Sequence, residues 1–209
     1  MGKDDAYSFA SRVDQQIEAL DSTTYLRGRD RAKRLQEELY PISRLALQLK
    51  QPGLEVEVEA FEDDGPADGH IRVSGFWQAE FDVQVTCDYD YAESLRRELL
   101  ASVGAAPGAG EIFRDKKTGT IRATGAAVDS DEHIGRIAKS VAALFKRKAA
   151  MAYGPNTILI IAFDEVKLRG LHHWHLLLLA LTQQEGMRGA GFSRVYLFND
   201  ATNELQQIA

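Results

Sequence analysis

The sequence has little cysteine, no long apolar run and no excess of positive charge. Its single cysteine, Cys87, excludes an internal disulfide and a cysteine-based zinc site, and suits a reducing compartment. The most hydrophobic run, Thr157–Phe163, is far too short to span a bilayer, and the first residues lack the apolar core of a signal peptide. These absences predict a cytoplasmic protein with no membrane partner.

The charge balance also limits how the chain could bind nucleic acid. Its net charge is −6, whereas a protein that binds DNA through its overall charge would be basic, so any such binding must come from a local patch. Hydrophobic residues make up 44% of the chain and charged residues 27%, which is a globular rather than a disordered composition. We predict an N-terminal helical arm over residues 1–28 and a single α/β domain over residues 29–209.

The hydrophobic pattern alternates between helical and strand periodicity, which predicts a mixed sheet flanked by helices. Pro41 is expected to kink the second helix, and Ser130 is expected to be the N-cap of the fourth. The predicted helices cover residues 4–21, 29–50, 90–103, 131–148 and 171–183. The predicted strands cover residues 54–59, 70–76, 80–87, 111–114, 120–124, 157–163 and 194–198.

The strands are expected to pair in three ways. Residues 70–76 and 80–87 are close enough in sequence for an antiparallel hairpin, and residues 111–124 read as a second hairpin. Thr157–Phe163 is continuously apolar, which is typical of a central strand buried on both faces. With the helix and strand that follow it, this segment predicts a parallel β-α-β unit at the C-terminus.

An acidic turn before one predicted strand and a polar pair on the next form the most informative part of the sequence. Asp68-Gly69-His70-Ile71 opens the first of these strands, and Val83-Gln84-Val85-Thr86 lies within the second. Because side chains alternate along a strand, Gln84 and Thr86 point to the same face. Asp68, at the mouth of the neighbouring strand, is expected to reach that region.

These residues resemble the active site of the PD-(D/E)XK nuclease superfamily, and within it the Mrr-like restriction endonucleases. In that family an acidic residue followed by glycine and an aliphatic residue begins one strand, and a Gln-x-Lys tripeptide lies on the next. The family core is a helix, three strands, a helix and a further strand, which resembles the predicted order over residues 30–165. The resemblance implies a restriction-endonuclease-like core with an added hairpin and a C-terminal β-α-β unit.

The resemblance also implies a Mg²⁺-dependent endonuclease acting on DNA, in which Asp68 and Gln84 bind the metal ion. In this family a glutamate on the first helix often completes the metal shell, and Glu38 is the candidate. At about 100° per residue, Glu38 falls within the apolar stripe of the helix predicted at residues 29–50. A carboxylate that faces inward needs a partner such as a metal, an arginine or a helix end.

Thr86 stands where the family carries its lysine, and here the chain departs from the pattern. A hydroxyl has no positive charge, so it cannot replace an ammonium group in stabilising negative charge. Lysines migrate to neighbouring elements in this superfamily, which makes Arg72, Arg96 and Arg97 candidate substitutes, although arginine is a poor base. Thr86 itself completes the predicted catalytic set as a weak substitute.

Two other interpretations stay open. The chain could be a catalytically inactive relative that keeps the fold as a nucleic-acid- or protein-binding module. It could also be an unrelated α/β protein, because Asp-Gly is a common turn signal and Gln and Thr are ordinary on the polar face of a strand. A structure that separates Glu38, Asp68 and Gln84 too widely to share one ion would argue against the nuclease interpretation.

Basic residues on the second hairpin offer a local contact for DNA. Lys116 and Lys117 lie at its predicted tip with Arg114 and Arg122 beside them, and these side chains could contact phosphates. The same Asp-x-x-Thr-Gly segment is equally a routine hairpin turn. Lys139 and the basic run at residues 146–148 could extend a basic face, although the run is also typical of a solvated helix end. The family resemblance adds the expectation of a homodimer.

Overall fold

A computed structural model of the chain describes residues 2–28, 30–62, 65–88, 91–108, 110–126, 129–151, 153–165, 168, 170–184 and 191–209. The strands are β1 (Asp4–Asp5), β2 (Leu54–Ala60), β3 (Gly69–Gly75), β4 (Ala79–Cys87), β5 (Ile112–Arg114), β6 (Ile121–Ala123), β7 (Thr157–Phe163), β8 (Arg194–Asn199) and β9 (Glu204–Gln207). The helices are α1 (Ala6–Glu18), α2 (Ser22–Arg27), α3 (Asp30–Arg34), the π-helical η1 (Leu35–Leu39), α4 (Tyr40–Leu49), α5 (Tyr91–Val103), α6 (Ser130–Ala149) and α7 (Gly170–Thr182).

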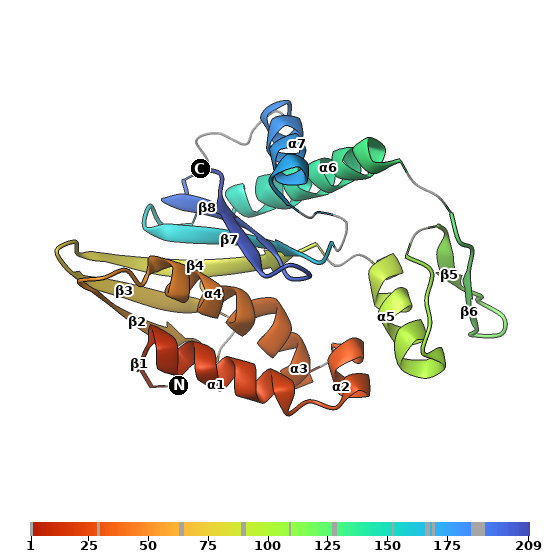
Figure 1. The fold of residues 1–209 in the computed structure, drawn as a ribbon, viewed down its shortest axis with the longest axis horizontal. Helices are drawn as coiled ribbons and strands as arrows, with labels where there is room; N and C mark the ends of the chain where they lie inside the picture. The colour runs from red at the N-terminus through yellow and green to blue at the C-terminus, as the bar shows by residue number, and fades with distance from the viewer. Residues whose placement is uncertain are drawn as a thin grey trace.

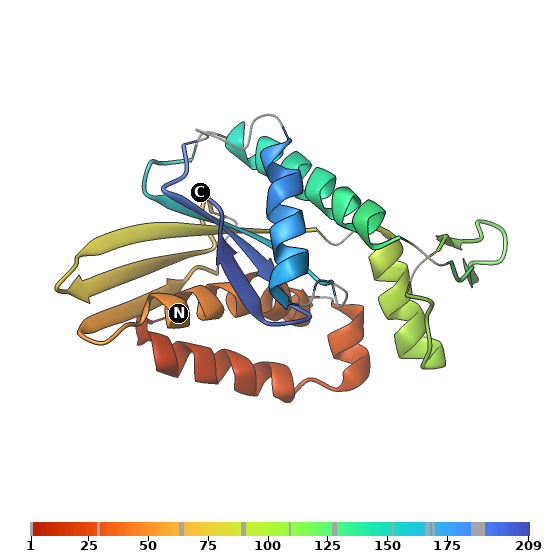
Figure 2. The same cartoon turned by 45° about the horizontal axis from the view of Figure 1, so that its top comes forward.

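The described strands form one mixed sheet in the order β1-β2-β3-β4-β7-β8-β9, and β5 and β6 form a separate hairpin. Helices α1 and α4 lie on one face of the sheet, and α6 and α7 lie on the other (Figures 1 and 2). The β3–β4 and β5–β6 hairpins are antiparallel, as the sequence predicted. The chain is therefore an α/β protein with a mixed sheet flanked by helices.

Strand β7 is the centre of both hydrophobic cores. It pairs in parallel with β4 on one side and β8 on the other, and all of its residues are buried. Ile158 and Ile160 pack in the core shared with α1 and α4, while Leu159 and Ile161 pack beneath α6 and α7. This confirms the predicted central strand, whose two buried faces require an apolar residue at every position.

Helix α1 packs into the hydrophobic core that it shares with the sheet. Strand β1 pairs with the edge of β2, and α1 buries Phe9 and Val13 in the same core as β2 and β3. Asp5 begins the helix, because its carboxylate accepts the backbone N–H groups of Tyr7 and Ser8. The apolar stripe of α1 is therefore covered by the sheet.

The helix predicted at residues 29–50 is interrupted in its middle. It consists of α3, the π-helical turn η1 and α4, and the N–H of Tyr40 donates to the carbonyl of Leu35, five residues earlier. Pro41 follows directly and has no N–H of its own, so the turn before it widens instead of continuing as a regular α-helix. Glu37 and Glu38 lie within this widened turn, which sets the direction of their carboxylates.

Helix α6, rather than α5, is the helix after β4 that covers the sheet. Helix α5 packs against α2 and β5, and with the β5–β6 hairpin it extends beyond the end of the sheet (Figures 1 and 2). The N-cap of α6 is Asp129, which accepts the N–H groups of Asp131 and Glu132, and not Ser130 as predicted. Among the described helices, none combines the length and apolarity needed to cross a bilayer.

A buried amide holds the chain that leaves β7. Asn199, fully buried at the end of β8, accepts the N–H of Glu165 at 3.0 Å and donates to the carbonyls of Glu165 (3.0 Å) and Leu168 (3.4 Å). We expect Asn199→Leu to lower the free energy of unfolding by about 2–4 kcal/mol, because backbone groups lose buried partners. Urea denaturation measures this, with the exposed Asn156→Ala as the control. Equal losses in the two variants would contradict the assigned role.

Candidate functional site

Asp68 is fixed where β3 begins. Its backbone N–H donates to Val83 at 2.8 Å, and its carbonyl accepts the N–H of Phe61 at 3.0 Å. The pairing of β3 with β4 ends at Gly69 and Val83. The backbone N–H of Val85, the next on β4 that points toward β3, therefore has no carbonyl of β3 opposite it and needs another acceptor. Asp68 Oδ2 supplies it at 2.6 Å. A Cβ on Gly69 would lie 3.0 Å from the carbonyl oxygen of Glu59, so glycine allows this close approach to β2.

Gln84 donates the second hydrogen bond that holds the Asp68 carboxylate in place. Its amide is buried on β4, and Nε2 donates to Asp68 Oδ2 at 2.5 Å and to the carbonyl of Val85 at 3.0 Å. Both hydrogen bonds that described residues donate to Asp68 therefore fall on the same oxygen. Thr86, one pleat further, is also buried, and its hydroxyl accepts a hydrogen bond from Arg147 at 3.4 Å. An arginine of α6 thus lies beside the position where the family carries its lysine.

Glu38 faces the same region from the π-helical turn. Its Oε2 lies 3.5 Å from Arg34 Nε, and Arg34 also donates to the carbonyl of Phe61 at the end of β2. Burial raises the pKa of Glu38 above its usual value, and the charge of Asp68 raises it further. Burial also raises the pKa of Asp68, against the opposing effects of the Val85 N–H and of Lys148 and Arg34. Burial therefore disfavours the charged form of both carboxylates in this site, and the charge of Asp68 further disfavours that of Glu38.

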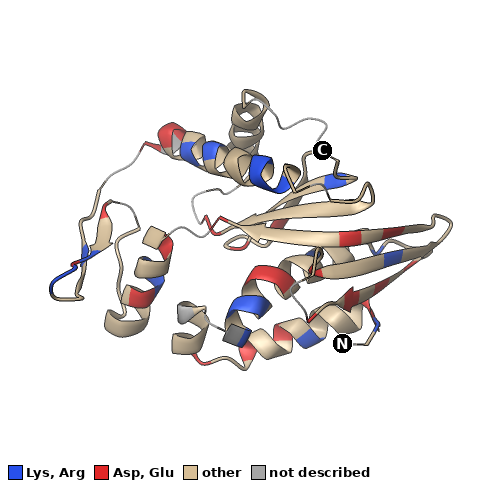
Figure 3. Ribbon diagram, turned by 180° about the vertical axis from the view of Figure 1, so that it is seen from behind, with Lys and Arg blue, Asp and Glu red and all other residues tan. Residues whose placement is uncertain are grey.

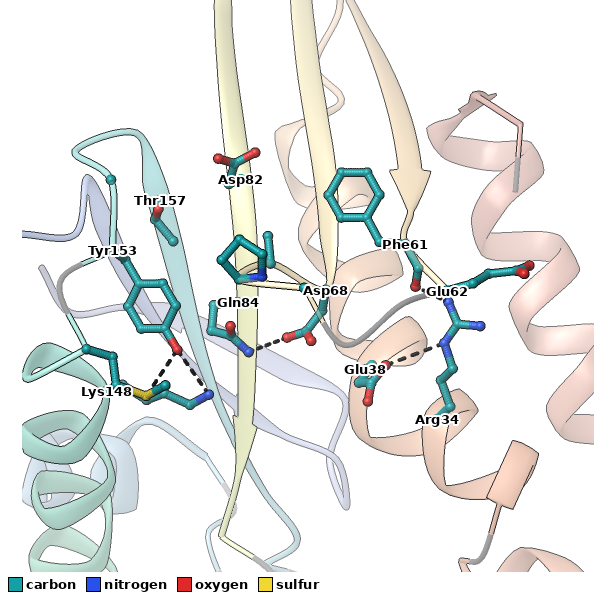
Figure 4. A pocket seen from close by; sticks show the side chains of 15 residues that line it. Arg34, Glu38, Phe61, Glu62, Asp68, Asp82, Gln84, Lys148, Tyr153 and Thr157 are labelled. Carbon is teal, nitrogen blue, oxygen red and sulfur yellow. Dashed lines mark hydrogen bonds and ion pairs between the residues drawn. The ribbon is translucent and has the colours of Figure 1, made fainter.

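Glu38, Asp68 and Gln84 line one pocket of about 480 Å³ (Figure 4). Lys148, in the last turn of α6, lines the same pocket and donates to the Tyr153 hydroxyl at 3.4 Å. Figure 4 shows Lys148 and Tyr153 on one side of Asp68, and Glu38 with Arg34 on the other. Thr86 is not among the described side chains that line the pocket.

No family model, curated protein or solved structure matches the chain. The chemistry of the pocket must therefore be argued from its own residues. Three of the four side chains predicted as catalytic meet there, and sequence reasoning did not place Arg34 or Lys148 among them. The basic run that ends α6 is visible in the sequence, but which of its side chains turns toward Asp68 depends on how α6 packs across β4 and β7.

The arginines expected to replace the family lysine lie elsewhere. Arg72 pairs with Glu80 at 2.7 Å on the exposed side of β3 and β4. Arg96 and Arg97 belong to α5, where Arg96 pairs with Glu93 and Arg97 pairs with Asp164 at 2.9 Å. None of these arginines is among the described residues that line the pocket. Lys148, by contrast, lines the pocket, and its charge lowers the pKa of Asp68 against the effect of burial.

The predicted DNA-contacting hairpin is partly engaged in its own ion pairs. Arg114 pairs with Glu98 of α5 at 2.6 Å, and Arg122 pairs with Asp115 at 3.5 Å. Lys116 and Lys117 are exposed in the turn. Two of the four expected contacts therefore already neutralise a carboxylate of the protein.

The donor set of the pocket suits a magnesium ion bound partly by its substrate. Carboxylate oxygens are hard ligands, and Mg²⁺ is commonly held by one or two carboxylates together with substrate phosphates and water. Asp68 and Glu38 provide two such groups, and a cation between them would favour their ionised forms. The described residues contain no group of three or more His, Cys, Asp and Glu side chains suited to a metal. A metal ion held by Asp68 and Glu38 alone would therefore keep further positions for water or for a bound ligand.

A second group of acids lies at the carboxyl ends of the parallel strands. Asp164 follows β7 and Asp200 follows β8, and Arg97 of α5 pairs with Asp164. Burial, followed by the charge of Asp164, raises the pKa of Asp200 to about 6, and Arg97 and Arg44 oppose the increase. Asp200 therefore ionises less readily in the folded protein than in the unfolded chain, and its ionisation at neutral pH costs stability.

We expect Asp200→Asn to stabilise the protein in a pH-dependent way. A raised folded-state pKa means that the stabilising contribution is present below about pH 4 and is lost as the pH rises through about 6. The variant should gain about 1–2 kcal/mol at pH 7.5, after allowance for partial exposure, and little at pH 4.5. Urea unfolding at both pH values measures this. An equal gain at the two pH values would indicate a packing effect and contradict the assignment.

Proposed function

We propose that the chain is a metal-dependent, nuclease-like hydrolase that cleaves phosphodiester bonds of DNA with a PD-(D/E)XK-type site. One observation supports the proposal above all. Gln84 Nε2 donates a hydrogen bond to Asp68 Oδ2 at 2.5 Å, and both side chains line one pocket with Glu38 and Lys148. The pocket is large enough for a nucleotide phosphate, and it combines two carboxylates with a lysine. Such a set of side chains is suited to binding and stabilising charged phosphoryl groups.

The order of the elements supports a restriction-endonuclease-like core. Helix α4, strands β2, β3 and β4, helix α6 and strand β7 follow one another as a helix, three strands, a helix and a strand. Helix α5 and the β5–β6 hairpin are then an insertion between β4 and α6, and α7 with β8 is the C-terminal addition. In this alignment Glu38 lies in η1, directly before the first core helix, and Lys148 lies on the second.

Each side chain has a separate role in the proposed site. Asp68 and Glu38 would hold Mg²⁺. Gln84, predicted as a further metal ligand, would instead orient Asp68 through the hydrogen bond that its Nε2 donates to Oδ2. The ion, when bound, lowers the pKa of a coordinated water and offsets charge that develops on the phosphate. Lys148 would supply the positive charge that Thr86 cannot. Arg34 would balance Glu38 in the absence of substrate.

The direct test is cleavage of supercoiled plasmid by the full chain with Mg²⁺, with Mn²⁺ or with EDTA. We expect nicked or linear DNA with either metal and none with EDTA. Absence of cleavage with both metals, at protein concentrations equimolar with the DNA, would refute the hydrolase proposal.

A second candidate, a catalytically inactive binding module, is favoured by one observation. Both carboxylates already have protein partners, since Gln84 and Val85 donate to Asp68 and Arg34 pairs with Glu38. Such a closed network would hold the fold together without metal. Mn²⁺ titration by calorimetry separates the two candidates, because the enzyme requires saturable binding that Asp68→Asn removes, whereas the inactive module requires none.

A further inference from the structure

Helix α6 presents a basic face to solvent. Arg136, Lys139, Lys146 and Arg147 are exposed, whereas the apolar side of the helix is buried against the sheet. After Glu132 the helix contains no acidic residue, although the protein as a whole carries a net charge of −6. Figure 3 shows blue segments along α6 with red confined to the end where the helix begins. Positive charge is therefore concentrated on one element of an acidic protein.

These cations are also available to an external partner. In the part of the chain that the structure describes, none of the four forms an ion pair with a carboxylate: Arg136 contacts His133, and Arg147 contacts the Thr86 hydroxyl. In the β5–β6 hairpin, by contrast, Arg114 and Arg122 form ion pairs with carboxylates of the protein. Unpaired cations on a helix repel one another and gain from a neutralising polyanion.

The basic face leads directly to the pocket. Arg136, Lys139 and Arg147 fall along one side of the helix. At about 1.5 Å per residue, the stretch from 136 to 147 spans roughly 16 Å, which equals the rise of about five base pairs along the axis of a DNA duplex. Lys148, next in the chain, lines the pocket with Asp68. A phosphate backbone that follows this face would therefore arrive at the carboxylates.

We infer that the exposed basic face of α6 is the surface that binds the DNA backbone and delivers it to the Asp68 pocket. This inference rests on the proposed function for its substrate and extends it by assigning where the substrate lies. An anionic membrane is the less suitable partner, because a helix that lies in a lipid interface needs a free apolar face and α6 uses its own against the sheet.

The test measures binding without cleavage. A fluorescein-labelled 30-bp duplex is titrated with the full chain in EDTA at several salt concentrations, and anisotropy gives Kd. We expect the double variant Lys139→Gln/Lys146→Gln to raise Kd about tenfold or more near 0.1 M salt and to lower the salt slope by up to about 1.8, or about 0.9 for each lost phosphate contact. Lys116→Gln/Lys117→Gln, which removes the same charge from the rival hairpin, should change Kd by less than about twofold.

Three results would overturn the inference: no measurable duplex binding by the native chain, a loss in the hairpin variant that equals that in the α6 variant, or binding to phosphatidylserine vesicles in preference to the duplex. Failure of the proposed function has a different signature. If the protein binds the duplex through α6 but does not cleave it with Mg²⁺ or Mn²⁺, the inferred DNA-binding surface stands and the proposed hydrolase activity fails.

Discussion

Asp68→Asn is expected to reduce metal-dependent DNA cleavage by roughly 10³-fold or more, because Asp68 would hold the ion on which the other groups depend. Asparagine keeps the shape of the side chain and an oxygen that can accept the N–H groups of Val85 and Gln84. The substitution thus removes the charge with little change in packing. Initial rates on plasmid DNA, at saturating Mg²⁺, measure the effect.

Asp82→Asn is the matched control for this experiment. Asp82 lines the same pocket and carries the same charge, but its side chain is 54% exposed and it pairs with His70 at 3.0 Å. Its loss should change the rate by less than about threefold, because Asp82 is exposed and its carboxylate is hydrogen-bonded to His70 and not to Asp68 or Gln84. Equal losses of activity in the two variants would show only that the pocket needs negative charge, and would contradict the specific role of Asp68.

The stability of Asp68→Asn separates a catalytic carboxylate from a structural one. Burial raises the pKa of Asp68, so its ionisation is disfavoured in the folded state relative to the unfolded chain. Its contribution to stability is present below the unfolded pKa and lost as the pH rises through the folded pKa. The variant should therefore unfold at an equal or higher urea concentration at pH 7.5. A large loss of stability would indicate that the carboxylate is chiefly structural.

The part of the site that the sequence predicts is the part set by local geometry. Asp68 and Gln84 lie on two strands of one antiparallel hairpin, where the pairing of Gly69 with Val83 fixes the register. Strand alternation and a short connection were enough to bring them to one face. The apolar pattern of β7 likewise revealed its central place, because burial on two faces leaves a continuous hydrophobic run.

The features of the site that could not be predicted from the sequence depend on contacts between distant segments. Lys148 reaches the pocket only because α6 packs over β4 and β7, and a basic helix end reads equally well as a solvated one. The packing of α1 on the sheet is hidden for the same reason. The π-helical turn before Pro41 is also not visible in the hydrophobic periodicity, which assumes a regular α-helix. Glu38 was therefore predicted on the apolar stripe, whereas it lies beside Arg34 with its side chain 38% exposed.

These differences change how the missing motif lysine should be viewed. Thr86 does not take over the lysine's position in the pocket, since it is buried and engaged by Arg147. A cation enters from α6 instead, from the same helix that carries the exposed basic face. Substrate binding and charge stabilisation would then come from one element, with α6 holding the backbone at its surface and presenting Lys148 at its end.

Lys148→Met is accordingly expected to lower kcat by about 10²–10³-fold, the loss typical of removing one preorganised charge-stabilising group. The apolar stem is kept, so packing beside Tyr153 should persist. Lys148→Arg should recover part of the rate, because arginine restores the charge in a different geometry. Lys146→Met, two residues earlier on the exposed face, should instead raise KM with little effect on kcat. Steady-state kinetics on a short labelled duplex distinguish these patterns.

The pH profile gives a second readout that a merely structural lysine would not move. Lys148 lowers the pKa of Asp68 against the effect of burial, so Lys148→Met should raise that pKa further. Because Asp68 must be ionised to hold the metal, the acid limb of the activity profile should shift to higher pH in the variant. An unchanged acid limb together with an unchanged kcat would remove Lys148 from the site, and the inactive binding module would then be the better account of the pocket.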